Sequence, residues 1–477
     1  MFEYFSIEQY HAQLQEGTVT CLQAAEFYLQ EIKAKQHLNV FIEVYADEVL
    51  EKAKQLDEKR KSGKVSGKLH GVIIALKDVI CYKDHKLSAA SNILRDFISL
   101  YSATAVERLL AEEAIIIGRT NCDEFAMGSS NENSAFGVVK NPLNESRVPG
   151  GSSGGSAVAV AADMCMASLG TDTGGSIRQP ASFCGIVGAK PTYGRVSRYG
   201  LTAHASSFDT IGPFANSVGD CTRILEVIAG HDKFDSTSMQ TPVPEYSAKV
   251  LSDNLPDELT IGYVPDIMGE GLQSEIKKII LDKIETLRTQ GFKIKEIKLP
   301  HSEYSVQTYY ILITAELSSN LARFDGARYG KRAESSETME EMYVNSRTEG
   351  FGTEVKRRIM LGTYVLSAGY YDAYYKKAQK VRRLIRQDFT NAFKDVDIIL
   401  IPTTPTTAFK IGEMIDDPLA MYLNDVYTTS ANLSGNPAMS IPVGKDDNGL
   451  PVGLQIIADQ FDEMNMFRIA EFIMRKC

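Results

Sequence analysis

Two short segments combine serine with unusually dense glycine, and both are candidates for a nucleophilic site. The first is residues 149–156, which contains Ser152, and the second is residues 170–178, which contains Ser176. Glycine lets backbone N–H groups approach a ligand closely. A helix beginning near Ser153 would add positive potential at its N-terminus. The two segments therefore point to a serine that acts on a bound ligand.

Three other interpretations of these segments are weaker. A flexible linker is disfavoured because small apolar residues follow directly at 157–162, as in a buried helix. A phosphate loop of the Walker type needs Gly-Lys-Ser/Thr after the glycines, which is absent. Residues 150–154 satisfy the G-x-S-x-G pattern of a nucleophile elbow, but the Ser-His-Asp mechanism needs a late histidine. The last histidine is His301, so such a triad is disfavoured.

A serine without histidine needs another base, and Lys77 is a good candidate. It ends the apolar run 72–76, a position from which a side chain can project from a sheet edge into a site. Burial can lower the pKa of a lysine by several units, which makes the neutral amine available. Next to Asp78, Lys77 also fits a surface ion pair. The glycine-rich segments downstream favour the catalytic interpretation.

Alternating helices and buried strands must position these residues, and that alternation predicts an α/β layer fold. Capping-box spacing at Ser6/Gln9 and at Thr20/Gln23 predicts two N-terminal helices. A third, charged helix is expected at 46–61, followed by a loop at 62–67. Strands are expected at 72–76, 114–117, 398–401, 438–443 and 452–458, and helices at 103–113 and 364–393, with further alternation at 274–298.

Composition narrows the class of protein. The chain has 477 residues and a formal net charge of −10, so it is poorly suited to hold a phosphate backbone by itself. If the function involves a nucleic acid, a partner protein is expected to bind it. The seven cysteines form no Cys-x-x-Cys pair, which disfavours a zinc site and suits a reducing cytosol. No basic, apolar leader opens the sequence, and no apolar run approaches the ~18 residues of a membrane span. We expect a cytoplasmic protein.

Together these motifs resemble the amidase signature family. The similar segments are residues 71–78, 150–156, 170–190, 432–438 and 449–455. The resemblance spans nearly the whole chain and implies a large mixed β-sheet covered by helices on both faces. It implies a single domain, 1–477, with N-terminal helices at 1–65, the signature core at 66–230, and the rest of the sheet and the pocket helices at 231–477.

The resemblance also implies roles for individual residues. Ser176 is the expected nucleophile, Ser152 relays its proton after a cis Gly151–Ser152 peptide, and neutral Lys77 acts as base and then acid. The backbone N–H groups of Thr173, Gly174, Gly175 and Ser176 are expected to form the oxyanion hole. Val79 stands where many members have asparagine, and Val158 and Val160 stand where alanines are usual. These departures touch none of the expected catalytic atoms.

Within the family, the chain is similar to the glutaminase subunits of tRNA-dependent amidotransferases. This rests on residues 190–198, 235–238, 323–330 and 350–359. A glutaminase needs a cation for the α-carboxylate and an anion for the α-amine, and arginine suits carboxylate because its planar fork binds in a bidentate way. The resemblance points to Arg358 for the carboxylate, Asp425 for the amine and Tyr309 as a lining residue. Arg357 is the alternative carboxylate ligand, and Arg358 would then be a surface charge.

The same resemblance implies partners. Ammonia released from glutamine would pass to a synthetase-type subunit, with a small third subunit completing the complex. The synthetase-type subunit would use ATP and Mg²⁺ to convert Glu-tRNA(Gln) to Gln-tRNA(Gln), with Asp-tRNA(Asn) an open second acceptor. No cofactor or metal is expected in this chain. The alternatives are a stand-alone amidase acting on a small amide and a catalytically inactive scaffold subunit.

Overall fold

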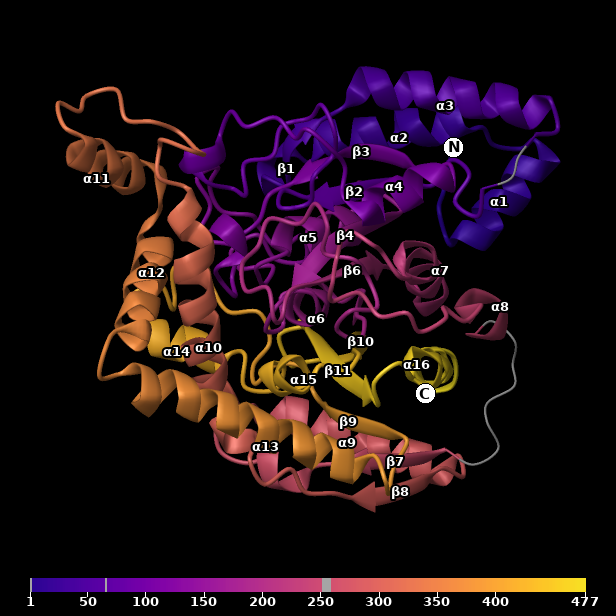
Figure 1. Cartoon of the computed structure of the whole chain (residues 1–477). Coiled ribbons are helices and arrows are strands. Elements are labelled where there is room, and N and C mark those ends of the chain that lie inside the picture. Colours follow the sequence, from indigo (N-terminus) through magenta and orange to yellow (C-terminus); the bar gives the residue numbers. More distant parts are fainter. Residues whose placement is uncertain (1, 65–66, 251–258) are drawn as a thin grey trace.

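The computed structural model describes residues 2–64, 67–250 and 259–477. These residues build one eleven-stranded mixed sheet surrounded by helices (Figure 1). The strands are β1 (Phe41–Val44), β2 (Ile73–Lys77), β3 (Ile115–Thr120), β4 (Ala167–Asp172), β5 (Val187–Lys190), β6 (Thr210–Ala215), β7 (Thr260–Tyr263), β8 (Lys293–Glu296), β9 (Ile398–Pro402), β10 (Ala438–Lys445) and β11 (Pro451–Ala458).

The order of the strands across the sheet is β1-β3-β2-β4-β6-β5-β10-β11-β9-β7-β8. Strands β3, β2 and β4 run parallel to one another, and so do β9, β7 and β8. The pairs between β4 and β9 are antiparallel, and so is the edge pair β1–β3. The second glycine-rich segment begins within β4, the direct neighbour of β2, which ends at Lys77.

Helices cover both faces of the sheet. Every residue of β2, β4 and β11 is buried, and successive side chains of a strand point to opposite faces, so neither face of these strands meets solvent. The α-helices are α1 (Ile7–Glu16), α2 (Cys21–Ala34), α3 (Ala46–Lys61), α4 (Thr104–Ala111), α5 (Gly154–Ala161), α6 (Arg178–Cys184), α7 (Val218–Ile228), α8 (Tyr246–Val250), α9 (Ser274–Thr289), α10 (Ser305–Asn320), α11 (Met339–Gly350), α12 (Thr353–Leu366), α13 (Lys377–Ala392), α14 (Pro418–Leu423), α15 (Thr429–Ser434) and α16 (Glu463–Lys476).

Two groups of helices frame the centre of the sheet, where the glycine-rich segments lie. Helix α5 begins within the first segment and α6 at the end of the second, with α5 packing on β2 and β4, and α6 on β5, β10 and β11. Helix α10 packs on α12, α13 and α15, and α13 also packs on α15; these helices build the region drawn in salmon, orange and yellow beside the sheet (Figure 1). None of the helices in the described part of the chain is long and apolar enough to span a membrane.

The local predictions hold well where helix caps and apolar runs are strong. Helix α3 occupies the predicted 46–61, and the predicted capping box at Thr20 is present at the start of α2. At the start of α1, Ser6 accepts from the backbone N–H of Gln9, without the reciprocal side-chain bond. The predicted strands are found with ends shifted by a few residues. Residues 65–66 of the predicted loop lie outside the described residues.

One prediction is wrong: no single helix covers residues 364–393. Helix α12 ends at Leu366, a π-helical turn occupies Tyr371–Lys376, and α13 begins at Lys377. Between them, Gly369 adopts a φ of 90°, which belongs to the left-handed region where glycine is at home. The break lets α12 and α13 take different directions around the site.

Candidate active site

Lys77 is fully buried at the end of β2 and is surrounded by hydroxyl groups. Its Nζ lies 2.7 Å from Ser152 Oγ, 2.9 Å from Ser153 Oγ and 2.8 Å from Thr171 Oγ1. No carboxylate among the described residues forms an ion pair with it, so the surface ion pair with Asp78 is not formed. Burial lowers the pKa of the Lys77 ammonium to about 8, against the effect of the more distant Cys122 and Asp123. The amine can therefore become neutral near physiological pH.

Ser152 and Ser153 reach Lys77 because the chain turns sharply before α5. The Gly151–Ser152 peptide is cis, as the family resemblance implies. The backbone carbonyl of Ser152 accepts from Asp123 N–H at 3.2 Å, and Gly151 N–H donates to Gln179 Oε1 at 3.1 Å. Ser153 Oγ donates to the Thr171 carbonyl at 3.0 Å, which links this segment to β4. The first glycine-rich segment thus packs directly against the second.

Asp172 shapes the second glycine-rich segment. Its carboxylate accepts backbone N–H groups from Gly175 at 2.9 Å and Ile177 at 3.1 Å. It also accepts from Arg178 Nε and Nη2 at 3.0 and 2.9 Å, and from Asn432 Nδ2 at 2.8 Å. Burial alone would raise the pKa of this carboxyl, but Arg178, Lys190 and Asn432 together outweigh burial and hold the pKa at about 2. The charged carboxylate therefore holds the loop around Ser176 in one conformation.

The loop leaves backbone donors free at its tip. Gly175 N–H is taken by Asp172, which removes one of the four donors predicted for the oxyanion hole. The N–H groups of Thr173, Gly174 and Ser176 form no hydrogen bond to any described residue. Ser176 is also the one partly accessible residue in the stretch 171–178. The arrangement offers an accessible hydroxyl beside unpaired backbone donors.

Glycine is required at position 174 because Tyr309 lies against it. A Cβ atom there would overlap the Tyr309 ring. At Gly175, where φ is 140°, a Cβ atom would overlap Thr428 Oγ1. Thr428 Oγ1 in turn donates to the Gly174 carbonyl at 2.5 Å. The glycines thus let Tyr309 of α10 and Thr428, next to α15, pack against the loop around Ser176, residues 173–177, called the serine loop below.

The Gly174→Ala variant is expected to be less stable by about 1–3 kcal/mol and poorly active, because the Tyr309 ring must move away from the loop. Urea denaturation measures the free energy of unfolding, and Gly269→Ala is the matched control, since a Cβ atom at Gly269 meets nothing within 4 Å. Equal stability of the two variants would contradict the assigned contact.

Arg358 is buried on α12 next to two tyrosine rings. Its Nε donates to Glu354 Oε1 at 2.8 Å, and its Cζ lies 5.2 Å and 5.4 Å from the ring centroids of Tyr310 and Tyr422. Its two terminal nitrogens form no hydrogen bond to the described residues. Burial alone would lower the pKa of Arg358, but Tyr310 and Glu354 raise it. Arg358 is thus a fixed cation whose two terminal nitrogens are available to bind a ligand. Arg357, the alternative, is only half-buried and pairs with the same Glu354.

Asp425 supplies a buried carboxylate near Arg358. It accepts from Tyr310 Oη at 2.8 Å and from Ser129 Oγ at 3.1 Å. Burial raises the pKa of Asp425 to about 6, against these two hydrogen bonds. Tyr309, the third predicted pocket residue, packs edge-on against Tyr310 with ring centroids 5.1 Å apart. Since Tyr309 also touches Gly174, the opposite charges and the serine loop border the same region.

Several residues of this region were not predicted. Tyr310, Tyr422 and Ser129 contact the predicted Arg358 and Asp425 because the fold brings distant segments together, whereas Glu354 lies one helical turn before Arg358 on α12. Thr171 and Asp172 could have been found from the sequence, because both lie inside the second glycine-rich segment. No hydrogen bond joins a histidine to Ser152 or Ser176 in the described chain, in line with the exclusion of a histidine triad. Nor do the described residues contain a cluster of three or more His, Cys, Asp or Glu side chains that could hold a metal ion.

Comparisons with known proteins show to which family the chain belongs. The Amidase family model matches residues 23–467. The A subunit of the glutamyl-tRNA(Gln) amidotransferase of Chlorobium limicola is 52% identical over 99% of both chains, and that of Koribacter versatilis is 53% identical over 96% of both. The crystal structure of the corresponding subunit from Thermotoga maritima has a TM-score of 0.77 and 38% identity, covering 98% of this chain and 94% of that one. The native peptide amidase of Stenotrophomonas maltophilia has a TM-score of 0.81 and 29% identity, covering 99% and 96%. With a family model matching most of its length and relatives aligned almost end to end, the chain belongs to the amidase family.

Proposed function

We propose that this chain is the glutaminase subunit of a glutamyl-tRNA(Gln) amidotransferase. The observation that carries the proposal is the buried pair of opposite charges, Arg358 and Asp425, beside a serine loop with a buried lysine. Free glutamine carries an α-carboxylate and an α-ammonium group, whereas a simple amide carries neither. The names of relatives above 50% identity support the same assignment.

In the proposed reaction, Ser176 Oγ attacks the carboxamide carbon of glutamine. Its proton passes through the Ser152 hydroxyl to the neutral amine of Lys77, which makes the serine a competent nucleophile. The tetrahedral oxyanion accepts hydrogen bonds from the free N–H groups of Thr173, Gly174 and Ser176. Gly175 shapes the turn. The intermediate collapses when the C–N bond breaks and the leaving nitrogen takes the proton back from Lys77. Ammonia departs, and water then hydrolyses the γ-glutamyl ester to glutamate by the same relay.

The ammonia is proposed to serve partner subunits. A synthetase-type subunit would bind ATP, Mg²⁺ and the tRNA, and a small third subunit would complete a heterotrimer in the cytoplasm. This chain would need no cofactor or metal of its own and would form a single amidase domain over residues 1–477. Its acidic net charge of −10 supports leaving most of the tRNA binding to the synthetase-type subunit.

Affinity capture of the chain from native lysate, with identification of the bound subunits, tests the proposal. Two co-purifying subunits in equal amounts are expected, and the complex should release glutamate from glutamine. Purification of the chain alone, with better turnover of small amides than of glutamine, would favour a stand-alone amidase. A reconstituted complex that forms Gln-tRNA(Gln) only from free ammonia would favour the scaffold alternative.

Arg358 is expected to bind the glutamine α-carboxylate. The Arg358→Ala variant should lose about 2–3 kcal/mol of binding, or roughly 30- to 150-fold in kcat/KM for glutamine, because the carboxylate loses a charged partner. It should lose much less on 4-aminobutanamide, which lacks the carboxylate. Arg357→Ala is the matched control, since Arg357 pairs with the same Glu354 but is far more exposed. A greater loss of kcat/KM for glutamine in the Arg357→Ala variant would make Arg357 the carboxylate ligand instead of Arg358. Equal losses of Arg358→Ala on glutamine and on 4-aminobutanamide would mean that Arg358 stabilises the fold and does not bind the carboxylate.

Asp425 is expected to bind the α-ammonium group as a charged carboxylate. Since its pKa is about 6, KM for glutamine should rise as the pH falls below that value and the carboxyl becomes neutral. Asp425→Asn should raise KM at every pH and remove this dependence, while glutaramate, which lacks the amine, should respond to neither change. Steady-state kinetics from pH 5 to pH 8 measures the effect. A KM for glutamine that stays constant across this range in the wild type would exclude the assignment.

A further inference from the structure

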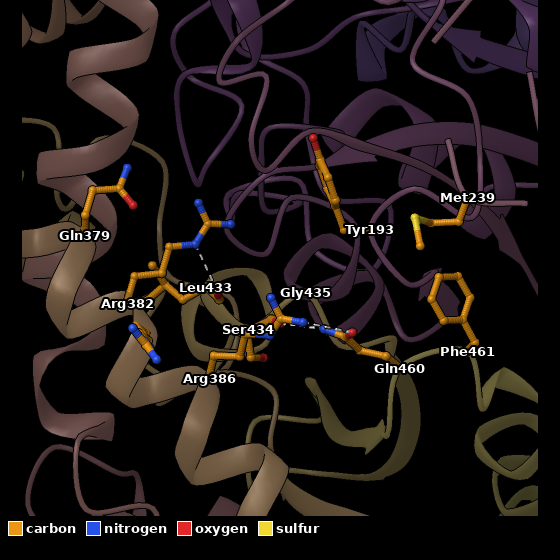
Figure 2. A pocket seen from close by; sticks show the side chains of 11 residues that line it. Tyr193, Met239, Gln379, Arg382, Arg386, Leu433, Ser434, Gly435, Gln460 and Phe461 are labelled. Carbon is orange, nitrogen blue, oxygen red and sulfur yellow. Dashed lines mark hydrogen bonds between the residues drawn. The ribbon is translucent and has the colours of Figure 1, made fainter. Parts of the chain in front are cut away.

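A second cavity, of about 430 Å³, lies between α13 and the turn at residues 433–435 (Figure 2). One wall is formed by Gln379, Arg382, Arg383 and Arg386, whose spacing places them on one face of α13. This volume is within the range of sites that bind small molecules. None of the residues proposed above for the glutaminase reaction lines this cavity.

The cavity is strongly positive, although the chain carries a net charge of −10. No aspartate or glutamate lines it, and none of its three arginines forms an ion pair with a described residue. Glu316 acts on Arg382 through its charge without pairing with it, and its carboxylate accepts the backbone N–H of Ser207 at 2.9 Å. Burial lowers the pKa of Arg382, and Arg386 adds to that shift. The three guanidinium groups therefore have no ion-pair partner among the described residues, and Glu316 offsets the charge of Arg382 only from a distance.

Arg382 is held in place, whereas its neighbours are exposed. Its Nε donates to the Leu433 carbonyl and its Nη2 to the Ser207 carbonyl, both at 3.1 Å, and its Cζ lies 4.1 Å from the ring centroid of Phe208. Arg386 has one long contact, 3.4 Å from Nη2 to Gln460 Oε1. The cavity thus has one fixed guanidinium group and two that are able to adjust to a ligand.

The opposite wall is aromatic. Figure 2 shows Tyr193 and Phe461 across the cavity from Arg382 and Arg386. Tyr193 is fixed by a 2.8 Å hydrogen bond from its hydroxyl to the Ser206 carbonyl, and Phe461 is covered on one side by Arg195, whose Cζ lies 4.6 Å from the ring centroid. Ordered rings next to cations that form no ion pair with a described residue offer both a stacking surface and an anion site.

We propose that this cavity binds a nucleotide, with the phosphate on the arginines and the base against Tyr193 or Phe461. Three guanidinium groups exceed what a single carboxylate needs, and a phosphomonoester carries about −1.5 to −2 charges. The guanidinium fork matches phosphate oxygens, and bases stack on aromatic side chains in a sequence-tolerant way. The nucleotide is either free or an unpaired residue of an RNA strand. This site is additional to the proposed glutaminase reaction.

The test is equilibrium binding to the full chain, with AMP and inorganic pyrophosphate followed by calorimetry and a fluorescent single-stranded RNA pentamer followed by anisotropy. The double variant Arg383→Gln/Arg386→Gln should bind AMP and RNA at least about tenfold more weakly, because two charge-assisted contacts are lost. Its salt dependence for RNA should fall by about 1.4 in log–log slope, at about 0.7 per lost phosphate contact. The matched control Lys377→Gln/Lys380→Gln removes two exposed charges from the same helix outside the cavity, and should bind like the wild type.

The base contact has a separate test. At least one of the variants Phe461→Leu and Tyr193→Leu should weaken AMP and RNA binding but leave pyrophosphate binding unchanged. AMP binding as tight as RNA binding assigns a free nucleotide, and markedly tighter RNA binding assigns an RNA strand. No binding of AMP or RNA by the wild type, equal losses in the two double variants, or stronger competition by a glutamate-rich hexapeptide than by AMP would overturn the proposal.

Discussion

The Ser176→Ala variant is expected to lose glutamine hydrolysis by about a thousandfold or more, since removal of a catalytic nucleophile costs at least that much in comparable hydrolases. Only one hydroxyl is lost, and Ser176 makes no hydrogen bond on which the described fold depends. The free energy of unfolding should therefore stay near that of the wild type. Glutamate release from glutamine measures the first effect, and urea denaturation measures the second.

Ser182→Ala is the matched control for Ser176. Ser182 lies in α6, six residues later, and its buried hydroxyl has no hydrogen-bond partner among the described residues. Its loss should leave the rate almost unchanged. The Ser176→Ala chain, assembled with its partner subunits, should still make Gln-tRNA(Gln) from free ammonia, because the nucleophile serves only the release of ammonia. Near wild-type glutaminase activity without the Ser176 hydroxyl would assign the nucleophile elsewhere.

Local sequence signals predicted the elements that position the site. The apolar run before Lys77 becomes β2, because a run of Ile, Ala and Leu between polar turns suits a strand buried on both faces. The charged segment 46–61 becomes α3, because its apolar residues recur at helical spacing. The glycines around Ser152 and Ser176 indicated backbone that a ligand could approach closely; in the structure Gly174 lies against the Tyr309 ring, and contact with a ligand stays a prediction.

Contacts between distant segments could not be predicted in the same way. Tyr310 binds Asp425 across 115 positions of the sequence, and no local pattern marks that pair. The choice between Arg357 and Arg358 depends on which face of α12 packs inward, and adjacent residues on a helix point about 100° apart. The break at Gly369 was hidden because apolar residues at helical spacing continue on both sides of it. Local sequence patterns were thus enough to identify the candidate serines, lysine and glycines, whereas they identified only part of the residues around Arg358 and Asp425.

Lys77 is expected to set the pH dependence of the proposed reaction. With a pKa of about 8, its neutral fraction grows almost tenfold per pH unit below pH 7, and the rate should follow until it levels off above pH 8. Lys77→Ala should lose about a hundred- to ten-thousandfold in kcat, the usual contribution of a general base. Lys77→Arg should fail as well, because a guanidinium group does not give up its proton at usable pH.

The pH profile alone cannot assign the base, because other buried groups have pKa values close to that of Lys77. Burial lowers the pKa of Lys190 to about 7, and that of Glu124 is raised to about 7. Lys190 Nζ donates to the Pro191 carbonyl at 3.0 Å and makes no hydrogen bond to a serine or threonine hydroxyl of the described chain. Substituting Lys190 by methionine should therefore reduce stability before it alters the profile. The same rise in rate with pH should remain in that variant and disappear in the Lys77 variants.

Chemical rescue separates a missing base from a damaged fold. Lys77→Ala leaves a space lined by the hydroxyls of Ser152, Ser153 and Thr171, which are the groups that Nζ contacts. Added methylamine or ethylamine should enter it and restore part of the activity, with a rate that rises with amine concentration and with the fraction of neutral amine. A bulky amine of similar pKa should not. The same additions should do nothing for Ser176→Ala, because an amine replaces the base and not the nucleophile. A Lys77→Arg enzyme with wild-type activity, or rescue that follows the protonated amine, would remove Lys77 from the proton relay and leave it a structural anchor between β2, the Ser152 turn and β4.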